Sequence, residues 1–540
     1  MVDIIKLLKE SNKNTFIGVA GPGTGKSYAF KTIIESDEFK DGKILILSFI
    51  NKLINDLKED FKDFKNVEIS TLHSFAMQSL GKPELSDNLD DIASEDYLFI
   101  NGETIDYEEK FYENNLEEKE YSFYKERQNF YKHELELYSF NSVIHEINNF
   151  FIQNEDKIPI YDLILIDEFQ DFNKSEYELI KILNKRNKIV AVGDDDQSLY
   201  VDFRKAKPDQ IRDLYNDSST EPFSLDYCYR CTEVIVNAAN SLISNATAKD
   251  FLAKRMKTKK FLYPLENNDK KHEVSKKYPK IIFIPEVTGD LLIYKLSETI
   301  KNDIKNTISK RILILTPFYL KQIIYDGLIE KGFNVVEFEL FFEEKSKGIK
   351  HKKLVELFEI LCKRKTDNLA LRNILHFYLK QDEIEELIKK IYKNKSKTIW
   401  DNLSKEVKNN IESDIVLFKK VKVGKVKLTN NELKRLSEVF NLKNILSKMI
   451  KGFSPISRKA IEVEMTTVMS SKGLSADFVY YVGIDDRNTM DFKSKKFTDY
   501  KICEFLVGIT RAKEKLTLIS LEDKSPSILE FIDSSLIEKL

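Results

Sequence analysis

The sequence predicts an α/β protein with two parallel-sheet cores, each of which carries a mainly helical insertion. Short apolar runs alternate with segments of helical spacing in two separate series, a pattern typical of parallel sheets. Each series is broken once by a long stretch that lacks this alternation. With 540 residues, 42% of them hydrophobic and 32% charged, the chain is globular in composition and long enough for several domains.

The first series starts near the N-terminus. Its expected strands are residues 15–20, 44–50, 67–75, 163–169 and 189–194. The stretch that interrupts it is strongly acidic, with 14 acidic and 3 basic residues between Gly81 and Glu120. We therefore expect a first core over residues 1–80 and 145–215, and an acidic helical insertion over residues 81–144.

The second series begins near Pro222. Its expected strands are residues 281–287, 311–318, 463–470, 478–484 and 515–520. The stretch between them is mostly helical in pattern and rich in lysine. We therefore expect a second core over residues 216–349 and 456–540, with residues 350–455 as its insertion.

The overall charge does not indicate what kind of partner the protein binds. Lysine and arginine number 86 against 88 aspartates and glutamates, and because a basic surface can be local, this balance neither supports nor excludes a nucleic acid. No apolar run approaches the ~20 residues that span a bilayer, and the N-terminal segment does not resemble a signal peptide. Because only four cysteines occur, we expect no disulfide framework and a reducing, cytoplasmic location.

A glycine-rich motif follows the first expected strand and opens a helix. Its glycines let backbone N–H groups surround phosphates, Lys26 can reach the β- and γ-phosphates, and the Ser27 hydroxyl can ligate Mg²⁺. Ala20 stands where the usual pattern has its first glycine. This context predicts a phosphate-binding loop (P-loop) made of Gly21, Pro22, Gly23, Thr24, Gly25, Lys26 and Ser27.

A pair of carboxylates ends the expected strand near residue 166. Asp167 can hold a metal ion through water, and Glu168 can orient an attacking water as general base. The alternative is an acidic strand end that caps a turn, which is a common feature. The upstream P-loop favours the catalytic interpretation.

Five motifs occur in a fixed order along the chain. They are Asp167-Glu168-Phe169-Gln170-Asp171, Gly193-Asp194-Asp195-Asp196-Gln197-Ser198-Leu199-Tyr200, Tyr229-Arg230, Ser471-Lys472-Gly473-Leu474 and Val507-Gly508-Ile509-Thr510-Arg511-Ala512. Together with the P-loop they resemble UvrD/Rep-type superfamily 1A helicases over residues 15–520. The resemblance implies two RecA-like P-loop cores, with ATP and Mg²⁺ as cofactors.

The resemblance also implies a role for each motif. Gln197 would sense the γ-phosphate and Tyr229 would stack on the base, while two arginine fingers from the second core would couple hydrolysis to domain motion. The implied catalytic residues are Lys26, Glu168, Gln197, Arg230 and Arg511. The implied metal ligands are Ser27 and Asp167. The implied nucleotide contacts are Ala20, Gly21, Pro22, Gly23, Thr24, Gly25, Lys26, Ser27, Tyr28, Tyr229 and Gly473.

Segments similar to three stretches of this chain line a single-strand channel in the family. Aromatic rings there can stack on bases without reading sequence, at about 1–3 kcal/mol each. Phe203 is spaced one residue further along than the common pattern, and Phe49 ends an apolar strand and could instead be a core residue. The implied nucleic-acid contacts are Phe49, Asn51, Lys52, Thr71, His73, Tyr200, Phe203 and Arg204.

Two further features have competing interpretations. The lysine-rich stretches 254–260 and 419–427 could add phosphate contacts or form solvated faces. Cys228 and Cys231 have the spacing of half a zinc site, but the sequence has no second cysteine or histidine pair, so we expect structural or incidental thiols.

The chain departs from the family pattern at several positions. No glutamine precedes Ser27, and Tyr28 replaces an arginine that commonly follows the P-loop, so adenine selection is open and other nucleoside triphosphates could be accepted. Met469 and Ser475 replace a histidine and a glutamate. Only 29 residues follow Arg511, so we expect a compact member without a fused nuclease.

The sequence thus predicts an ATP-dependent 3′→5′ translocase or helicase on single-stranded DNA, or at a junction with duplex, that serves in DNA repair or phage defence. One alternative is a nucleotide switch or scaffold that is regulated by a protein partner at the acidic insertion and unwinds little itself. A motor that moves on RNA is another.

Overall fold

The computed structural model describes residues 4–48, 57–59, 61–132, 135–256, 259–264, 269–287, 289–305, 310–337, 351–423, 429, 431, 435, 461–522 and 524–540. The chain divides into two compact units. The first comprises Met1–Leu72, Asn154–Glu344 and Ile456–Leu540, and the second comprises His73–Gln153 and Lys345–Pro455. Among the described residues, no helix has both the length and the apolar character needed to cross a membrane.

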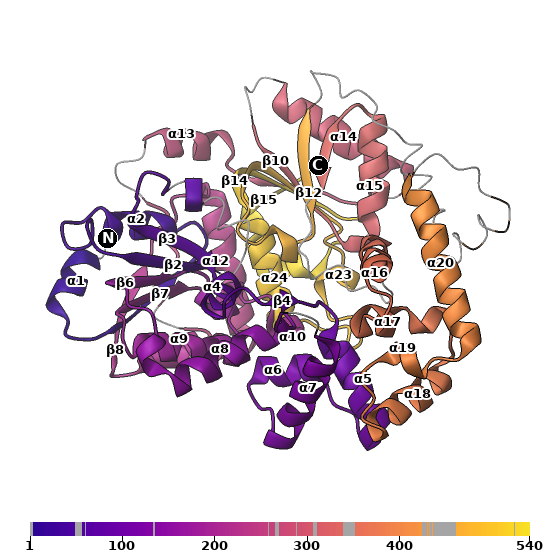
Figure 1. Ribbon diagram of the computed structural model, residues 1–540. Coiled ribbons are helices and arrows are strands. Elements are labelled where there is room, and N and C mark those ends of the chain that lie inside the picture. Colours follow the sequence, from indigo (N-terminus) through magenta and orange to yellow (C-terminus); the bar gives the residue numbers. More distant parts are fainter. Residues whose placement is uncertain are drawn as a thin grey trace. The chain divides into compact units, whose positions relative to one another are not determined.

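The first unit contains a six-stranded, fully parallel sheet of order β3-β2-β6-β7-β1-β8 (Figure 1). Its inner strands are continuous apolar runs because helices cover both faces of such a sheet. The strands are β1 (Thr15–Ala20), β2 (Ile44–Ser48), β3 (Val67–Thr71), β6 (Leu163–Ile166), β7 (Ile189–Gly193) and β8 (Thr220–Leu225). The helices are α1 (Ile4–Glu10), α2 (Lys26–Ile34), α9 (Lys174–Asn184), α10 (Val201–Arg204) and α11 (Pro208–Asn216), with one-turn helices η2 (Phe169–Asp171) and η3 (Asp195–Gln197).

Strand β8 lies beyond the expected boundary of the first core. The sequence places the start of the second core at residue 216, whereas β8 pairs with β1 and completes the first sheet. β8 is an edge strand, where Pro222 is tolerated although it cannot donate a ladder hydrogen bond. The first core therefore extends to Leu225.

The expected strand over residues 67–75 is too long. β3 ends at Thr71, and helix α4 (Leu72–Ser79) begins at the next residue. Leu72, Phe75 and Ala76 are buried and have helical spacing, so packing of this face selects a helix over a longer strand.

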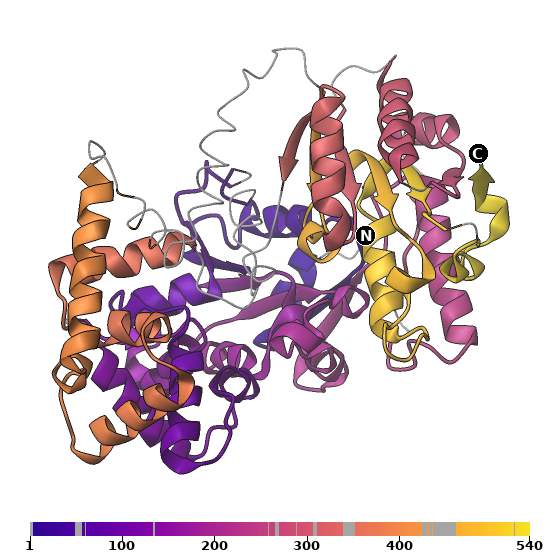
Figure 2. The same cartoon turned by 90° about the vertical axis from the view of Figure 1, so that its right-hand side faces the viewer.

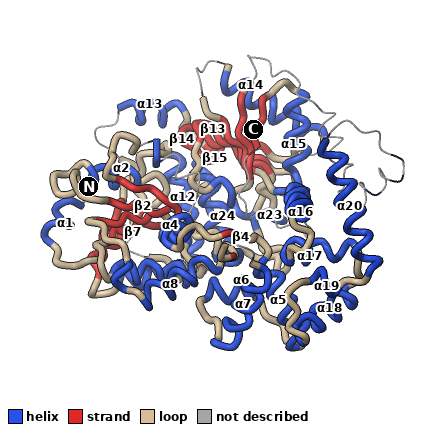
Figure 3. Tube along the Cα trace, in the orientation of Figure 1, coloured by secondary structure: helices blue, strands red, loops and turns tan. Residues whose placement is uncertain are grey.

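The first unit also contains a seven-stranded parallel sheet of order β11-β12-β10-β13-β14-β9-β15. Figure 3 shows its strands with α14 and α15 beside them. The strands are β9 (Ile281–Ile284), β10 (Ile312–Leu315), β11 (Asn334–Glu337), β12 (Glu462–Thr466), β13 (Ala476–Val482), β14 (Ala512–Ile519) and β15 (Ile537–Lys539). The helices are α12 (Glu233–Ala248), α13 (Asp269–Lys277), α14 (Asp290–Ile304), α15 (Phe318–Glu330), α23 (Asp486–Thr489) and α24 (Asp499–Ile509). Short one-turn helices η6 (Met469–Ser471), η7 (Ser527–Phe531) and η8 (Ser534–Leu536) complete this part.

Side-chain alternation along β10 separates the two faces of this second sheet. Leu313 and Leu315 pack with residues of α12 and α24, whereas Ile312 and Ile314 pack with residues of α14 and α15. Both faces are thus buried, as expected for a parallel sheet. The molecule has the predicted fold class, with two RecA-like parallel-sheet cores and mainly helical insertions.

The second unit contains both insertions. Its elements from the first insertion are β4 (Glu84–Leu85), α5 (Leu89–Asn101), α6 (Tyr107–Glu113), α7 (Glu118–Tyr131), β5 (Leu137–Tyr138) and α8 (Ser142–Gln153), and the one-turn helix η1 (Glu155–Lys157) that follows already belongs to the first unit. Those from the second are α16 (His351–Lys363), α17 (Asn368–Ile374), η5 (Leu375–Phe377), α18 (Gln381–Lys393), α19 (Ile399–Asn402) and α20 (Lys405–Val423). The unit thus reaches Gln153, past the expected end of the first insertion at residue 144.

The two insertions share one apolar core and a buried ion-pair network. Figures 1 and 2 both show α5–α7 beside α17–α19, and residues of both insertions form one hydrophobic cluster. At its centre the Asp96 carboxylate pairs with Arg127 at 2.8 Å and with Arg372 at 3.1 Å. Arg372 also pairs with Glu95 at 2.5 Å. Part of the acidic charge is therefore neutralised within the unit, by an arginine more than two hundred residues away in sequence.

Candidate nucleotide-binding and catalytic site

The P-loop connects β1 to the N-terminus of α2. Gly25 precedes the helix with φ 90°, and Gly23 has φ 67°, conformations that glycine adopts without strain. The Thr24 hydroxyl donates a hydrogen bond to the Gly21 carbonyl at 2.9 Å, which holds the loop closed. A Cβ at Gly23 would lie 2.2 Å from Cβ of Arg230, so this glycine also lets the second core approach.

The carboxylates that follow β6 face the P-loop lysine. Nζ of Lys26 donates to Oε1 of Glu168 at 2.5 Å and lies 3.8 Å from Oδ1 of Asp167. Glu168 has φ 53°, a left-handed conformation that is uncommon for a residue with a side chain. Such backbone strain is typical of functional sites.

Burial and charge shift the pKa values of this group in opposite directions. Burial favours the neutral form of Glu168, but Lys26 and Lys472 outweigh it and lower the pKa of that carboxyl well below its ordinary value. Burial likewise opposes the charge of Lys26, yet Glu168 and Asp167 raise its pKa. At Asp167 burial dominates over the attraction of Lys26 and raises the pKa to about 6. Glu168 is therefore held ionised.

A chain of amide hydrogen bonds continues from Glu168 along the first sheet. Gln170 donates to Oε2 of Glu168 at 2.7 Å and accepts from the backbone N–H of Asp194 at 2.8 Å. Gln197 donates from Nε2 to Oδ2 of Asp194 at 2.6 Å. These contacts fix the orientation of both amides relative to the general-base candidate.

The second core contributes three groups to the same place. Arg511, which follows α24, donates to Oε1 of Gln197 at 3.1 Å and is held by the carbonyls of Val507 and Leu474. The backbone N–H of Tyr229 donates to the Gly23 carbonyl at 2.9 Å. Lys472 donates to the Asp171 carboxylate and to the Gln197 carbonyl. The two sheets thus meet through polar contacts at the P-loop.

A cavity of about 450 Å³ lies at this meeting point. Because residues of both sheets line it, a nucleoside triphosphate bound there would contact both cores. The structure brings together the following residues singled out from the sequence: Pro22, Gly23, Thr24, Gly25, Lys26, Ser27, Tyr28, Asp167, Glu168, Gln197, Tyr229, Arg230, Gly473 and Arg511. Ala20 is buried at the end of β1, and Gly21 is buried at the start of the loop.

Comparisons with known proteins agree with this geometry. Residues 5–202 match a family model described as an AAA domain. The chain is 24% identical to the ATP-dependent DNA helicase Rep of Buchnera aphidicola subsp. Acyrthosiphon pisum, over 92% of this chain and 91% of the relative. It is 25% identical to the protein of the same name from Buchnera aphidicola subsp. Schizaphis graminum, over 92% and 90%. A probable DNA helicase II homolog of Mycoplasma capricolum is 29% identical over 42% of this chain and 38% of the relative. The chain is thus similar to UvrD/Rep-type DNA helicases over 92% of its length.

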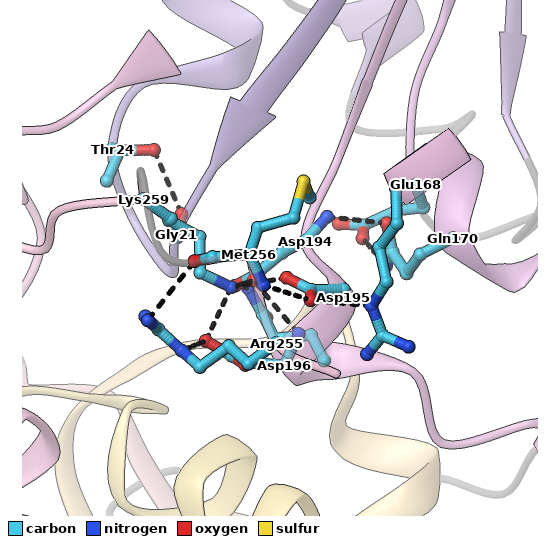
Figure 4. A network of polar contacts seen from close by, with 12 residues as sticks. Gly21, Thr24, Glu168, Gln170, Asp194, Asp195, Asp196, Arg255, Met256 and Lys259 are labelled. Carbon is cyan, nitrogen blue, oxygen red and sulfur yellow. Dashed lines mark hydrogen bonds and ion pairs between the residues drawn. The ribbon is translucent and has the colours of Figure 1, made fainter. Parts of the chain in front are cut away.

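Sequence reasoning named Lys259 only as a candidate phosphate contact within the stretch 254–260, whereas the structure gives it a different role. Its side chain is buried and its ammonium group pairs with the carboxylates of Asp194, Asp195 and Asp196 (Figure 4). The three carboxylates lie close enough to share a metal ion, but Lys259 already supplies a cation between them. The run of three acidic residues next to Gln197 was the available signal, because buried aspartates require a cationic partner.

Two arginines complete this charge cluster. Arg255 donates to Asp196 at 2.8 Å, and Arg212 donates to Asp195 at 2.9 Å. Of the stretch 254–260, Arg255 and Lys259 therefore pair with aspartates inside the protein, whereas Lys254 and Lys260 are exposed. Lys513 also lines the phosphate cavity and was not anticipated.

The expected nucleic-acid contacts are divided between the two units, and three of them lie outside the described residues. Phe49, Asn51 and Lys52 lie outside the described residues. In the first unit, Thr71 is the buried last residue of β3, and Phe203 is half-buried in α10. In the second unit, the His73 ring stacks on Phe140, with centroids 3.8 Å apart and planes 7° apart.

Two further expected contacts, Tyr200 and Arg204, are buried like Thr71. The Tyr200 hydroxyl lies 3.5 Å from the Met469 carbonyl, and its ring lies 5.5 Å from Nζ of Lys472. Arg204 pairs with Glu176 at 2.9 Å, with both side chains about 1% exposed. We expected both to contact nucleic acid, but packing between the cores covers Tyr200, and a buried carboxylate engages Arg204.

Hydrogen bonds with backbone groups hold the side chains of the two cysteines in place. Cys228 and Cys231 are free and buried, and the N–H of Cys231 donates to Sγ of Cys228 at 3.4 Å. The Cys231 thiol donates to the Thr510 carbonyl at 3.6 Å. Both thiols thus pack beside the Tyr229-Arg230 motif.

In the lysine-rich stretch 419–427, residues 424–427 lie outside the described part of the chain.

Proposed function

We propose that this protein is an ATP- and Mg²⁺-dependent motor that moves 3′→5′ along single-stranded DNA and separates duplex at junctions. The observation that supports it most directly is the single cavity lined by the P-loop, by Glu168 and by Arg230 and Arg511 from the second core. The names of the relatives, ATP-dependent DNA helicase Rep and DNA helicase II, support ATP and DNA as the substrates.

We propose that different residues of this cavity perform different parts of ATP hydrolysis. Lys26 and the P-loop N–H groups would bind the β- and γ-phosphates, in competition with the present Lys26–Glu168 hydrogen bond. Glu168, held ionised by its lysine neighbours, would accept a proton from the attacking water. Arg230 and Arg511 would stabilise the charge that develops on the transferred phosphoryl group.

Two oxygen ligands in the cavity suit Mg²⁺. Ser27 is exposed at the start of α2, and Asp167 lines the same cavity. A hydroxyl and a carboxylate are ligands that Mg²⁺ accepts beside nucleotide phosphates, and the ion would neutralise phosphate charge.

Movement would follow from the contacts between the two cores. A nucleotide held by the P-loop and by Arg511 would draw the cores together, and its hydrolysis would release them. Arg511 contacts Gln197, and Lys472 contacts Asp171 and Gln197. The binding or loss of a nucleotide in the cavity would therefore shift the Tyr200–Phe203 segment, which follows Gln197. We propose Phe203 as a stacking residue for single-stranded DNA.

Steady-state ATP hydrolysis with and without single-stranded DNA tests the proposal. We expect strong stimulation by DNA, and for Glu168→Gln a loss of about 10²–10⁴ in rate, the usual contribution of a general base. Unwinding of a duplex with a 3′ tail but not of one with a 5′ tail would support the polarity. Hydrolysis that DNA does not stimulate would overturn the motor proposal in favour of a switch regulated by a protein partner.

A reducing, cytoplasmic location is a further proposal, consistent with four cysteines that are all free thiols. A role in DNA repair or phage defence stays a prediction.

A further inference from the structure

The buried ammonium group of Lys259 lies at the centre of a charge cluster and does not line the phosphate cavity. It pairs with the carboxylates of Asp194, Asp195 and Asp196, and the distance from Nζ to Oδ1 of Asp195 is 2.7 Å (Figure 4). A lysine ammonium has three N–H donors, so one lysine can serve three converging carboxylates. Burial opposes the charge of Lys259, but the three aspartates outweigh burial and raise its pKa. The group therefore stays protonated.

The backbone on both sides of Lys259 is anchored by hydrogen bonds. The N–H of Met256 donates to Oδ2 of Asp195, which belongs to η3, at 3.1 Å. The carbonyl of Phe261 accepts from Nδ2 of Asn240, which belongs to α12, at 2.7 Å. The lysine is thus held between a one-turn helix of the first core and a long helix of the second.

The three aspartates differ in the number of cations that they contact. Arg212 pairs with Asp195 at 2.9 Å, and Arg255 pairs with Asp196 at 2.8 Å. In the part of the chain that the structure describes, Asp194 forms an ion pair with the lysine alone. Loss of the ammonium group would therefore leave Asp194 beside two like charges and without a cation of its own.

Asp194 sets the orientation of the Gln197 amide. Oδ2 of Asp194 accepts from Nε2 of Gln197 at 2.6 Å, and Oε1 of Gln197 accepts from Nη2 of Arg511 at 3.1 Å. Because a carboxylate only accepts and a guanidinium only donates, the two ends of the amide cannot exchange places. A protonated Asp194 would remove this constraint, since a carboxylic acid can also donate.

Asp194 also connects to the general-base candidate. Its backbone N–H donates to Oε1 of Gln170 at 2.8 Å, and Gln170 donates from Nε2 to Oε2 of Glu168 at 2.7 Å. The aspartate that Lys259 holds thus contacts two amides, one next to Glu168 and the other next to Arg511. A continuous chain of polar contacts leads from the buried lysine to both groups.

We propose that Lys259 is a positioning residue for ATP hydrolysis, which keeps Asp194 ionised and in place and thereby orients Gln197 toward Arg511. The inference rests on the proposed function to the extent that Gln197 and Arg511 act on a nucleotide in the phosphate cavity. Because Lys259 itself does not line that cavity, it affects the rate of hydrolysis and leaves the affinity for nucleotide unchanged.

A charge-balanced pair of substitutions tests this role. Lys259→Met alone leaves three buried carboxylates with two arginines, so a loss of activity in that variant would not distinguish positioning from unfolding. Lys259→Met combined with Asp195→Asn restores the balance of charge, and Arg212 keeps its ion pair with Asp209 at 2.9 Å. In this double variant Asp194 still lacks its cation.

Steady-state ATP hydrolysis by the full-length protein in Mg²⁺, without DNA, is the measurement. For the charge-balanced pair we expect kcat to fall about 10- to 100-fold, as when a group that orients the reacting atoms is misplaced, with KM nearly unchanged. Asp195→Asn alone keeps Lys259 paired with Asp194 and should retain most of the wild-type kcat. Lys260→Met, at an exposed position one residue along, is the matched control and should retain all of it. Denaturant unfolding verifies that each variant is folded.

A cycle with Gln197→Ala locates the effect. If Lys259 acts through Gln197, the charge-balanced pair should add little further loss of kcat to Gln197→Ala, because residues that act as a unit are not additive. A wild-type kcat in the charge-balanced pair would overturn the proposal, as would losses that multiply in the combination. The motor proposal fails separately: hydrolysis that does not respond to DNA would refute the motor and leave this comparison of basal rates intact.

Discussion

Nη2 of Arg511 donates a hydrogen bond to Oε1 of Gln197 at 3.1 Å, and this contact joins the two sheets. Arg511 lies between α24 and β14 of the second sheet, whereas Gln197 follows β7 of the first. The same amide donates from Nε2 to Asp194 at 2.6 Å. Because a glutamine can accept on one atom and donate on the other, Gln197 links Arg511 to Asp194 of the first core.

Arg511→Ala should abolish most hydrolysis while leaving the fold intact. The variant removes a guanidinium that would stabilise transition-state charge, so we expect kcat for ATP to fall by about 10³-fold or more. Arg487→Ala, which removes an exposed arginine from the same core, should retain wild-type kcat. Nearly unchanged kcat in Arg511→Ala would show that this residue only holds the cores together.

Hydrolysis should fall at alkaline pH. Burial, and then the like charge of Arg230, lower the pKa of Arg511 to about 9. The protonated guanidinium is the active form, so kcat/KM should be constant below that pKa and fall about tenfold per pH unit above it. Circular dichroism at each pH serves to separate this loss from unfolding.

Arg230→Gln should move the alkaline decrease in kcat/KM, the alkaline limb of the pH profile, to higher pH, because it removes the neighbouring positive charge. The variant is also expected to be slower at every pH, so the position of the limb, not the rate, is the readout. A limb that stays at the same pH would assign it to another group.

Lys259→Met should destabilise the protein strongly. It would leave the carboxylates of Asp194, Asp195 and Asp196 without their central cation, which typically costs about 3–5 kcal/mol for a buried pair. Lys260→Met, one residue along at an exposed position, should change stability by about 0.5 kcal/mol at most. Denaturant unfolding of both variants compares their stabilities. Equal unfolding midpoints would contradict a stabilising role for the buried charge cluster.

Phe203→Ala should weaken the response to DNA and spare the basal reaction. Removal of one stacked ring is worth about 1–3 kcal/mol, so the DNA concentration for half-maximal stimulation should rise about 5- to 150-fold. Phe492→Ala, at a phenylalanine that is 85% exposed, is the control. If basal hydrolysis falls together with the DNA response, Phe203 acts through the core and not on the strand.

The fold class could be predicted because it depends on local periodicity. Apolar runs such as 163–166 and 312–315 are buried on both sides and fall in the two sheets. The same reasoning assigned the segment of β8, which contains Pro222, to the second core. Only pairing with β1 places this strand in the first sheet, and pairing between distant segments is not visible in a local pattern.

The sequence by itself determined the P-loop, the Asp167–Glu168 pair and the arginine motifs, because each depends on residues adjacent in the chain and on the local backbone that they adopt. The tertiary structure alone decided which charges meet. It pairs Lys259 with Asp194–Asp196, pairs Arg204 with Glu176, and joins the two insertions through Asp96 and Arg372. A buried charge must find an opposite charge or a donor wherever packing brings one, and packing is set by the whole chain.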